Sequence, residues 1–377
     1  MKIKIKLLSR LYFVLMSFAL AACQSGWQIE LISNDLTQGL ITSSEVKFYL
    51  DQSDEPIELV PLGQLFYING FSLIDKIKII SEKSETTSYV WDEVAPSATI
   101  SVSGEIIING VSFYPEEIVV NESSLASEID NSILDIPPTM SHVLGLPDLP
   151  DAIGKVRHET KAEYGVMILL DGLQFHKLIT LINTGQLPFF EHTNEIERAL
   201  TVYPSVTTSA TAAVLTGTTP QINGVYGHGY RSTELTTLFD LAVDNGLNVI
   251  AVEGSSLPFN LRNAETLLSG DRDGNGYSDD NVFTNSLDII QSNMPDLMYI
   301  HFHEIDDMGH SYGPESSEYE SALIRVDGYL KKIYEALPED TFIILFADHG
   351  MHTTEDGGNH GTLTAADLII PIIYLEK

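Results

Sequence analysis

The sequence predicts an α/β fold, with a mostly parallel sheet sandwiched by helices and a small all-β module before it. From about residue 164 onward, short and almost continuously apolar runs alternate with amphipathic stretches. Such runs are expected for strands that helices cover on both faces. Residues 27–120 instead alternate apolar and polar side chains with period two and are rich in β-branched and aromatic residues, which predicts the β module.

Composition excludes several classes of protein. The chain has 377 residues, and its 53 acidic and 20 basic residues give a formal net charge of −33. This charge repels phosphate backbones and acidic headgroups, which argues against a nucleic-acid-binding domain and against electrostatic recruitment to membranes. Because 44% of the residues are hydrophobic, the chain can bury a large core. The single cysteine excludes intrachain disulfides and cysteine-built metal sites, and the oligomeric state stays open.

The first residues have the pattern of a targeting segment. A basic start is followed by an apolar run and then by Leu20-Ala21-Ala22-Cys23. Residues 1–22 resemble a bacterial lipoprotein signal peptide, in which Cys23 would be acylated and become the first mature residue. The alternative is an ordinary cleaved signal peptide. The lipoprotein interpretation predicts an extracytoplasmic protein anchored to the membrane by lipid, at the periplasmic face or the cell surface.

Three segments follow the signal peptide. Residues 23–130 are expected to form the β module, with Asn69-Gly70 and Asn109-Gly110 as candidate hairpin turns. The module would be a spacer, a binding domain, or an extension packed on the main domain. Residues 131–160 contain four prolines and little periodicity, which predicts a linker. Residues 161–377 form the predicted α/β domain.

Metal-type ligands follow the predicted strands of that domain. In parallel sheets, functional groups collect at the carboxyl ends of strands. Carboxylates and imidazoles without thiolates suit zinc, with manganese or another divalent ion as alternatives. Six such ligands are too many for one tetrahedral ion and about right for two. The six are Asp171, Asp306, His310, Asp348, His349 and His360.

A nucleophile is expected beside these ligands. Residues 203–217 contain a proline turn, several hydroxyls and then an Ala-rich helical run. A hydroxyl at a helix start lies in the positive field of the helix dipole, and a nearby cation would lower its pKa further. The alternative is that this Ser/Thr cluster only caps the helix.

The ordered set of MILLDG, YPSVTTSATAAVLTG, Asp306-x-x-Gly309-His310, ADHGM and GGNHG resembles the alkaline phosphatase superfamily, in particular its type I phosphodiesterase/nucleotide pyrophosphatase branch. The resemblance covers residues 164–377. It implies one zinc held by Asp306, His310 and His360, and a second held by Asp171, Asp348 and His349. It also implies a threonine nucleophile that contacts the second zinc, at Thr207, with Thr208 as the neighbouring alternative.

The resemblance implies a hydrolase that cleaves phosphodiester or nucleotide pyrophosphate bonds through a phosphothreonine intermediate. The branch generally has an asparagine three residues after the nucleophile, but this chain has Ala210, which weakens the expected diester preference. A phosphomonoesterase or phosphonate hydrolase of the same superfamily is the first alternative. A catalytically inactive metal-binding surface lipoprotein is the second.

Several other residues have weaker signals. His301 and His303 alternate along a strand and are interpreted as core or ligand-supporting histidines, with metal contact as the less favoured option. His228, Tyr230 and Arg231 follow the nucleophile segment, and Arg231 could meet a substrate phosphate. A candidate calcium loop has EF-hand-like spacing but lacks the closing glutamate, so an acidic surface turn is an equal alternative. Its oxygen ligands would be Asp271, Asp273, Asn275 and Asp279.

Overall fold

The structure is a computed structural model that describes residues 26–34, 36–52, 57–81, 85–193 and 195–377. The chain divides into two compact units, Met1–Glu128 with Thr362–Ala365, and Ile129–Gly361 with Ala366–Lys377. The signal segment and Cys23 lie outside the described residues. Within the described part of the chain, no helix combines the length and apolarity needed to cross a membrane.

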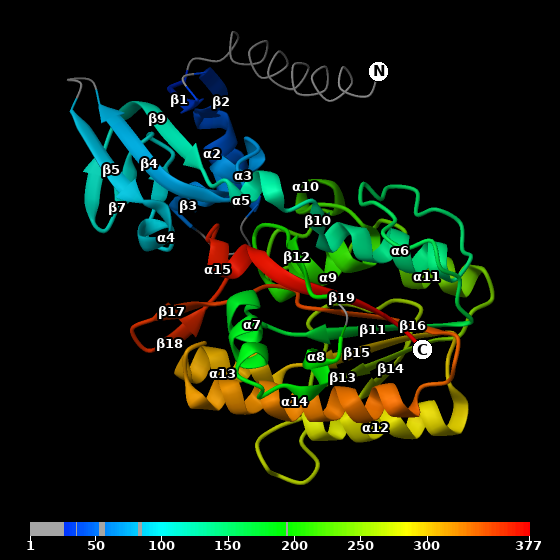
Figure 1. The fold of residues 1–377 in the computed structure, drawn as a ribbon. Coiled ribbons are helices and arrows are strands. Elements are labelled where there is room, and N and C mark those ends of the chain that lie inside the picture. The colour runs from blue at the N-terminus through cyan, green and yellow to red at the C-terminus, as the bar shows by residue number, and fades with distance from the viewer. Residues whose placement is uncertain (1–25, 35, 53–56, 82–84, 194) are drawn as a thin grey trace. The chain divides into compact units, whose positions relative to one another are not determined.

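The first unit contains two small sheets (Figure 1). Five strands form one sheet in the order β2-β1-β9-β4-β5, and four form the other in the order β3-β6-β7-β8. The Asn109-Gly110 turn has φ angles of 49° and 76° and joins β7 to β8, as the dipeptide predicted. The strands are β1 (Gln28–Ser33), β2 (Leu36–Thr42), β3 (Leu59–Pro61), β4 (Ile74–Ser81), β5 (Thr86–Val90), β6 (Thr99–Ser101), β7 (Ile106–Ile108), β8 (Val111–Phe113) and β9 (Pro115–Glu122).

This unit also contains helices, so the all-β expectation was wrong in detail. Two segments expected as strands lie in α2 (Ser43–Gln52) and α3 (Leu62–Ile68); α4 (Trp91–Val94) and α5 (Leu125–Glu128) are shorter. A reciprocal capping box starts α2, because Glu45 Oε2 accepts from the Thr42 backbone N–H while the Glu45 N–H donates to Thr42 Oγ1. In α3, Leu62, Leu65 and Phe66 are fully buried at helical spacing.

Residues 131–160 differ from the linker expected there. They carry β10 (Asn131–Ser132), the 3₁₀ turn η1 (Ile133–Asp135) and α6 (Ile136–Val143), and side chains such as Ile136 and Met140 are buried in the core of the second unit. The prolines had favoured a linker, but two of them lie in the first turn of α6. Proline has no N–H to lose there, and its fixed φ suits a helix start.

The second unit is built on an eight-stranded sheet, in the order β10-β12-β19-β16-β11-β15-β13-β14. Strands β16, β11, β15, β13 and β14 run parallel, so their carboxyl ends meet at one edge of the sheet. All residues of β15 and β16 are buried, as expected for strands covered on both faces. Besides β10, the strands of this sheet are β11 (Tyr164–Leu170), β12 (Glu197–Leu200), β13 (Val249–Glu253), β14 (Glu265–Leu268), β15 (Leu297–Phe302), β16 (Thr341–Phe346) and β19 (Ile369–Glu376).

Helices cover both faces of this sheet and confirm the predicted α/β class (Figure 1). Helices α6, α9 and α11 contact one another on one face, and on the other face α14 contacts both α12 and α13. A two-stranded hairpin of β17 (His352–Thr354) and β18 (Gly357–Asn359) packs on α13. The helices are α7 (Phe175–Asn183), α8 (Pro188–Glu191), α9 (Thr207–Thr216), α10 (Pro220–Asn223), α11 (Leu238–Asp244), α12 (Asp279–Asn293), α13 (Glu304–Tyr312), α14 (Ser317–Ala336) and α15 (Ala365–Leu368).

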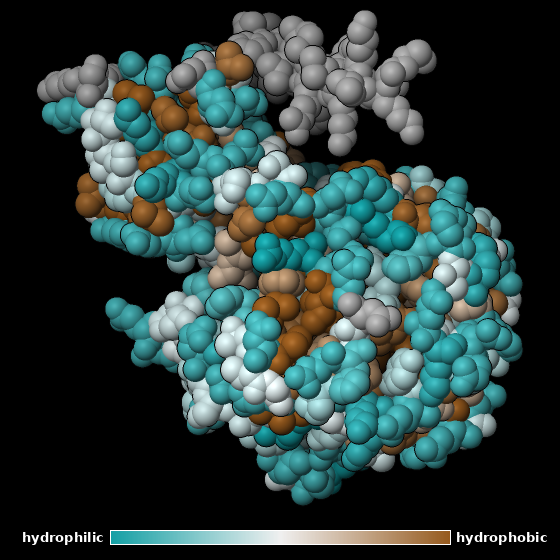
Figure 2. Space-filling model, viewed as in Figure 1, coloured by the Kyte–Doolittle hydropathy of each residue, from teal (hydrophilic) through white to brown (hydrophobic). Residues whose placement is uncertain are grey.

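A groove of about 710 Å³ opens on the second unit, with Phe189, Tyr334, Phe342 and Tyr374 among its lining residues. Phe342 lies near the start of β16, whereas the metal-type ligands follow the ends of the parallel strands. Figure 2 shows apolar side chains gathered in a hollow on a face that is otherwise mainly hydrophilic. This groove is therefore separate from the candidate site.

Candidate active site

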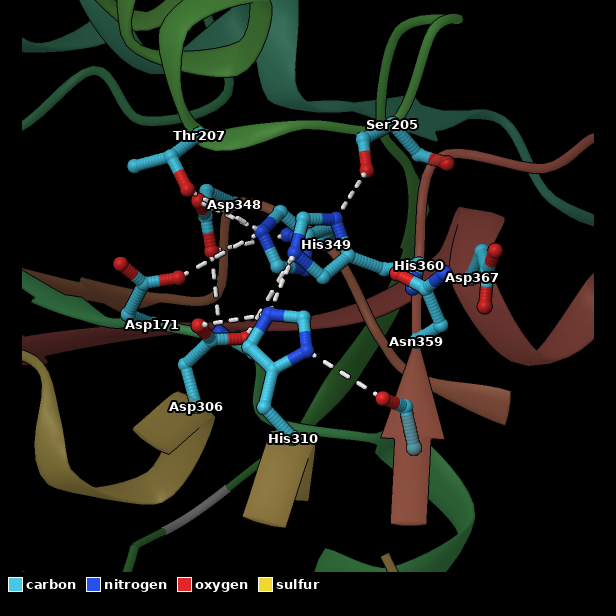
Figure 3. Close-up of polar contacts among 12 residues, drawn as sticks. Asp171, Ser205, Thr207, Asp306, His310, Asp348, His349, Asn359, His360 and Asp367 are labelled. Carbon is cyan, nitrogen blue, oxygen red and sulfur yellow. Dashed lines mark hydrogen bonds and ion pairs between the residues drawn. The ribbon is translucent and has the colours of Figure 1, made fainter. Parts of the chain in front are cut away.

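The sheet brings the six predicted ligands together (Figure 3). Asp171 directly follows β11, and Asp348 and His349 follow the neighbouring strand β16. Strand β15, on the other side of β11, leads into α13, which carries Asp306 in its first turn and His310 in its last. His360 comes next to the end of β18.

One cluster, here called group 2, consists of Asp171, Asp348 and His349, with Thr207 beside it. His349 Nε2 lies 3.4 Å from Asp171 Oδ1, 3.2 Å from Asp348 Oδ2 and 3.3 Å from Thr207 Oγ1. Ligand atoms of a tetrahedral zinc with bonds of about 2.0–2.1 Å lie about 3.3–3.4 Å apart. These three distances therefore fit four ligand atoms around one ion.

A second cluster, group 1, consists of Asp306, His310 and His360. His310 Nε2 lies 3.3 Å from Asp306 Oδ2 and 3.1 Å from His360 Nε2. His360 Nε2 lies 3.8 Å from Asp306 Oδ1. The three side chains therefore lie close together, with His310 near one oxygen of Asp306 and His360 near the other, at distances of 3.1 to 3.8 Å.

The histidine tautomers favour metal binding at both groups. The Nδ1 atoms of His310, His349 and His360 lie 3.2, 2.9 and 3.0 Å from the backbone oxygens of Gly358, Gly350 and Ser205. A neutral imidazole that donates from Nδ1 keeps its lone pair on Nε2. All three Nε2 atoms therefore have a lone pair available for a metal ion.

Ring geometry separates His349 from His360. Their rings stack at 3.6 Å between centroids and 16° between planes, so their in-plane lone pairs run side by side. The His310 and His360 rings are tilted by 52°, and their Nε2 atoms meet. By distance alone, Asp306, His349 and His360 could also hold one metal ion together. The stacking instead favours different ions for His349 and His360, in the partition that the resemblance implies.

One oxygen of each carboxylate in the site has no hydrogen-bond partner within the described part of the chain. Among the described residues, Asp171 Oδ1, Asp306 Oδ1 and Asp348 Oδ2 are buried without a hydrogen-bond partner. Burial and the adjacent carboxylates of Asp348 and Asp306 raise the pKa of Asp171 well above its usual value. Burial would raise the pKa of Asp306 too, but in the metal-free site a hydrogen bond from a protonated His310 and the positive charge of protonated neighbouring histidines lower it to about 2. Bound cations would offset this concentration of buried negative charge.

The two candidate nucleophiles lie in different environments. Thr207 is the first residue of α9, after the N-cap Val206, and its Oγ1 faces His349. The Thr208 side chain is buried, and its Oγ1 has no hydrogen-bond partner within the described residues. Ala210 has only a methyl side chain, so it offers the site no polar group, and it is fully buried in the core.

Of the three residues singled out after the nucleophile helix, one lies near the site and two do not. His228 is exposed, and its ring lies 6.2 Å from that of His360, so it borders group 1. Arg231 instead donates from Nη1 to the Pro258 carbonyl at 2.6 Å, and Tyr230 packs against the core. Of the three, His228 therefore has the contact with the site.

The candidate calcium loop is not assembled as expected. Asp271 and Asp273 are exposed, and Asp271 accepts backbone N–H groups of the loop itself, as in an acidic turn. Asp279 was misassigned to this loop. It is fully buried, and its two carboxylate oxygens accept the backbone N–H groups of His303 and Glu304 at 2.9 Å each. Asp279 thus anchors the start of α13, which carries two ligands.

The sequence analysis missed Glu253. This residue ends β13, is 1% exposed, and contacts both His301 and His303. It had a usable signal, because it follows the apolar run LNVIAV just as Asp171 follows GVMILL. His301 and His303, in turn, lie beside Asp171, which agrees with a supporting role for the two histidines.

The fold and this cluster define an α/β protein of the alkaline phosphatase superfamily. The profile of the type I phosphodiesterase / nucleotide pyrophosphatase family matches residues 166–247 and 255–369. The chain belongs to that family.

Named relatives are similar over part of the chain. GPI ethanolamine phosphate transferase 3 of Eremothecium gossypii is 31% identical over 113 residues, which are 30% of this chain and 11% of that protein. The catalytic subunit of human GPI ethanolamine phosphate transferase 3 is 28% identical over 105 residues, 28% of this chain and 9% of that protein. The matched region thus spans about a tenth of the length of these relatives.

Similar solved structures include phosphonoacetate hydrolase from Sinorhizobium meliloti, with 18% identity and a TM-score of 0.42 over 50% of this chain and 57% of that one. Murine ectonucleotide pyrophosphatase / phosphodiesterase 5 has 15% identity and a TM-score of 0.42 over 51% of this chain and 58% of that one.

Proposed function

We propose that this protein cleaves phosphodiester or nucleotide pyrophosphate bonds at a site for two zinc ions, through a phosphothreonine intermediate on Thr207. The observation that carries the proposal is that three Nε2 atoms, each on a ring whose Nδ1 lies beside a backbone oxygen, gather with three carboxylates, and that the Thr207 hydroxyl lies 3.3 Å from one of them, His349 Nε2. Group 1 would hold one ion and group 2 the other.

In the proposed reaction, Thr207 Oγ1 forms a bond to phosphorus as the bond from phosphorus to the leaving oxygen breaks. The Thr207 proton is released, and the leaving group acquires a proton. Water then attacks phosphorus, the bond from phosphorus to Thr207 breaks, and the hydroxyl is restored. Bound divalent ions would lower the pKa of the attacking hydroxyl and offset the negative charge on the phosphoryl oxygens.

Transfer to an alcohol is the second candidate function. The curated relatives are named as ethanolamine phosphate transferases. A phosphothreonine intermediate serves both outcomes, because either water or an acceptor hydroxyl can attack it. The chemistry at Thr207 is then the same, and the acceptor decides whether the enzyme is a hydrolase or a transferase.

One assay separates these functions. Purified protein is incubated with p-nitrophenyl phosphoethanolamine, with zinc or with a chelator, and with or without an added alcohol. Zinc-dependent release of nitrophenol with free phosphoethanolamine as product supports hydrolysis, whereas a new diester that contains the alcohol supports transfer. Preference for p-nitrophenyl phosphate would favour a phosphomonoesterase. If no ester is cleaved with two zinc ions bound, the chain is a metal-binding protein without this catalysis.

A further inference from the structure

Three adjacent parallel strands bring an acid, a histidine and a second acid to the same sheet edge behind group 2. Glu253 is the last residue of β13, His301 lies in β15, and Asp171 follows β11. The register pairs Leu169 with His301, and Asp171 lies two residues beyond Leu169, on the same face. The three side chains therefore line up across the sheet.

The two oxygens of Asp171 have different surroundings. His301 Nε2 lies 3.0 Å from Oδ2, whereas Oδ1 lies 3.4 Å from His349 Nε2 and has no hydrogen-bond partner among the described residues. His301 thus binds Oδ2, which leaves Oδ1 to bind an ion.

Glu253 in turn holds the histidines. Its Oε2 lies 3.0 Å from His301 Nδ1 and 3.1 Å from His303 Nε2. The rings of His301 and His303 stack at 3.6 Å, and His303 Nδ1 lies 3.7 Å from Asp171 Oδ2. Both imidazoles therefore bridge the same two carboxylates. Because Glu253 and His301 are almost completely buried, water does not compete for these contacts.

A third metal ion is the alternative use of this cluster, since Asp171, His301 and His303 each bring a ligand atom close to the others. The planes of the two stacked rings differ by only 28°. Their in-plane lone pairs therefore run nearly side by side and do not converge on one ion. Each ring also has a carboxylate beside both of its nitrogens. One nitrogen of each ring is in a hydrogen bond, His301 Nε2 with Asp171 and His303 Nε2 with Glu253, and the other nitrogen is within ion-pair distance of the opposite carboxylate.

We propose that Glu253 is a positioning residue for the group 2 metal site, and that it acts through His301 to fix the Asp171 carboxylate with Oδ1 toward the ion. The inference rests on the proposed two-ion site and adds to it a residue that does not touch the ion. Loss of such a supporting partner typically weakens metal affinity by about 10–100-fold.

The test measures zinc dissociation constants of the full-length protein by competition with a chelator. The His360→Ala background leaves group 2 as the intact site, and the Asp348→Ala background leaves group 1. Glu253→Gln should raise the dissociation constant about 10–100-fold in the first background and less than about threefold in the second. Asp327→Asn is the matched control, because Asp327 is a buried acid that binds the N–H groups of α8 instead. It should change neither constant.

A double-variant cycle tests whether Glu253 acts through His301. His301→Leu should weaken group 2 selectively, and Glu253→Gln combined with it should weaken the site no further. Additive effects would overturn the route through His301, and equal weakening of both groups would show a general structural effect. If Glu253→Gln fails to fold, a group 2 affinity unchanged by His301→Leu overturns the inference. A wild-type protein that binds no zinc would refute the proposed function itself, whereas normal zinc binding unaffected by Glu253→Gln would refute only the positioning role.

Discussion

Removing the Thr207 hydroxyl is the most direct test of the covalent route. Thr207→Val keeps the shape of the side chain and deletes the one oxygen that lies 3.3 Å from His349 Nε2. Asp171, Asp348 and His349 remain, so the variant should still bind two zinc ions at saturating metal, with water in the vacated position. We expect turnover to fall at least about a hundredfold, which corresponds to about 2.7 kcal/mol of transition-state stabilisation.

Thr208→Val is the matched control, since the Thr208 hydroxyl is buried and unpaired among the described residues. A methyl group can replace it without the loss of a hydrogen bond, so turnover should stay within about threefold. Initial rates with bis(p-nitrophenyl) phosphate give turnover, and mass spectrometry after acid quenching should detect a p-nitrophenyl phosphoryl group on Thr207 in the wild type. Loss of activity in Thr208→Val but not in Thr207→Val would move the nucleophile by one residue. Full activity in both variants would refute covalent catalysis and indicate direct attack by water.

Three further predictions concern metal, membrane and pH. Metal analysis should find about two equivalents of zinc, with His360→Ala emptying chiefly group 1 and Asp171→Ala group 2; a single equivalent in the wild type would contradict two sites. Cys23→Ser, expressed in a bacterial host, should no longer fractionate with membranes; persistent membrane association would contradict a lipid anchor on that residue. Burial raises the pKa of Asp279 from 3.8 to about 6, so the folded state favours its protonated form, and the resulting stability is lost as pH rises from about 4 to 6. Urea unfolding of the metal-free protein measures this effect. Between pH 4 and 7, the free energy of unfolding should fall by up to roughly 3 kcal/mol more for the wild type than for Asp279→Asn. An equal fall in both proteins would contradict the raised pKa of Asp279.

The sequence predicted the sheet and the convergence of ligands because both follow from strand order. Asp171 and Asp348 come after continuous apolar runs, and parallel strands end at one edge. The roles of individual atoms were not predictable, since they depend on contacts between distant residues. The sequence indicated a core or ligand-supporting role for His301, but not that the residue lies between Glu253 and Asp171.

Sequence patterns gave wrong predictions where the same local pattern is compatible with two different structures. The segment QLFYING fits a strand by composition, but burial of Leu65 and Phe66 on one face makes it a helix. Asp279 has the spacing of a calcium ligand, and it was the backbone of His303, 24 residues away in sequence, that determined its direction.

The first unit combines residues from the start of the chain with Thr362–Ala365, so it cannot be completed early in synthesis. Within that unit, the buried indole of Trp91 donates from Nε1 to the Leu363 carbonyl at 2.7 Å, across 272 positions of sequence. A ribosome has therefore made nearly the whole chain before this hydrogen bond can form. A fragment that stops at Glu128 would leave the indole N–H without this acceptor, at a cost of about 1–3 kcal/mol if it stays buried. Isolated expression of the module thus calls for a fragment that also supplies residues 362–365.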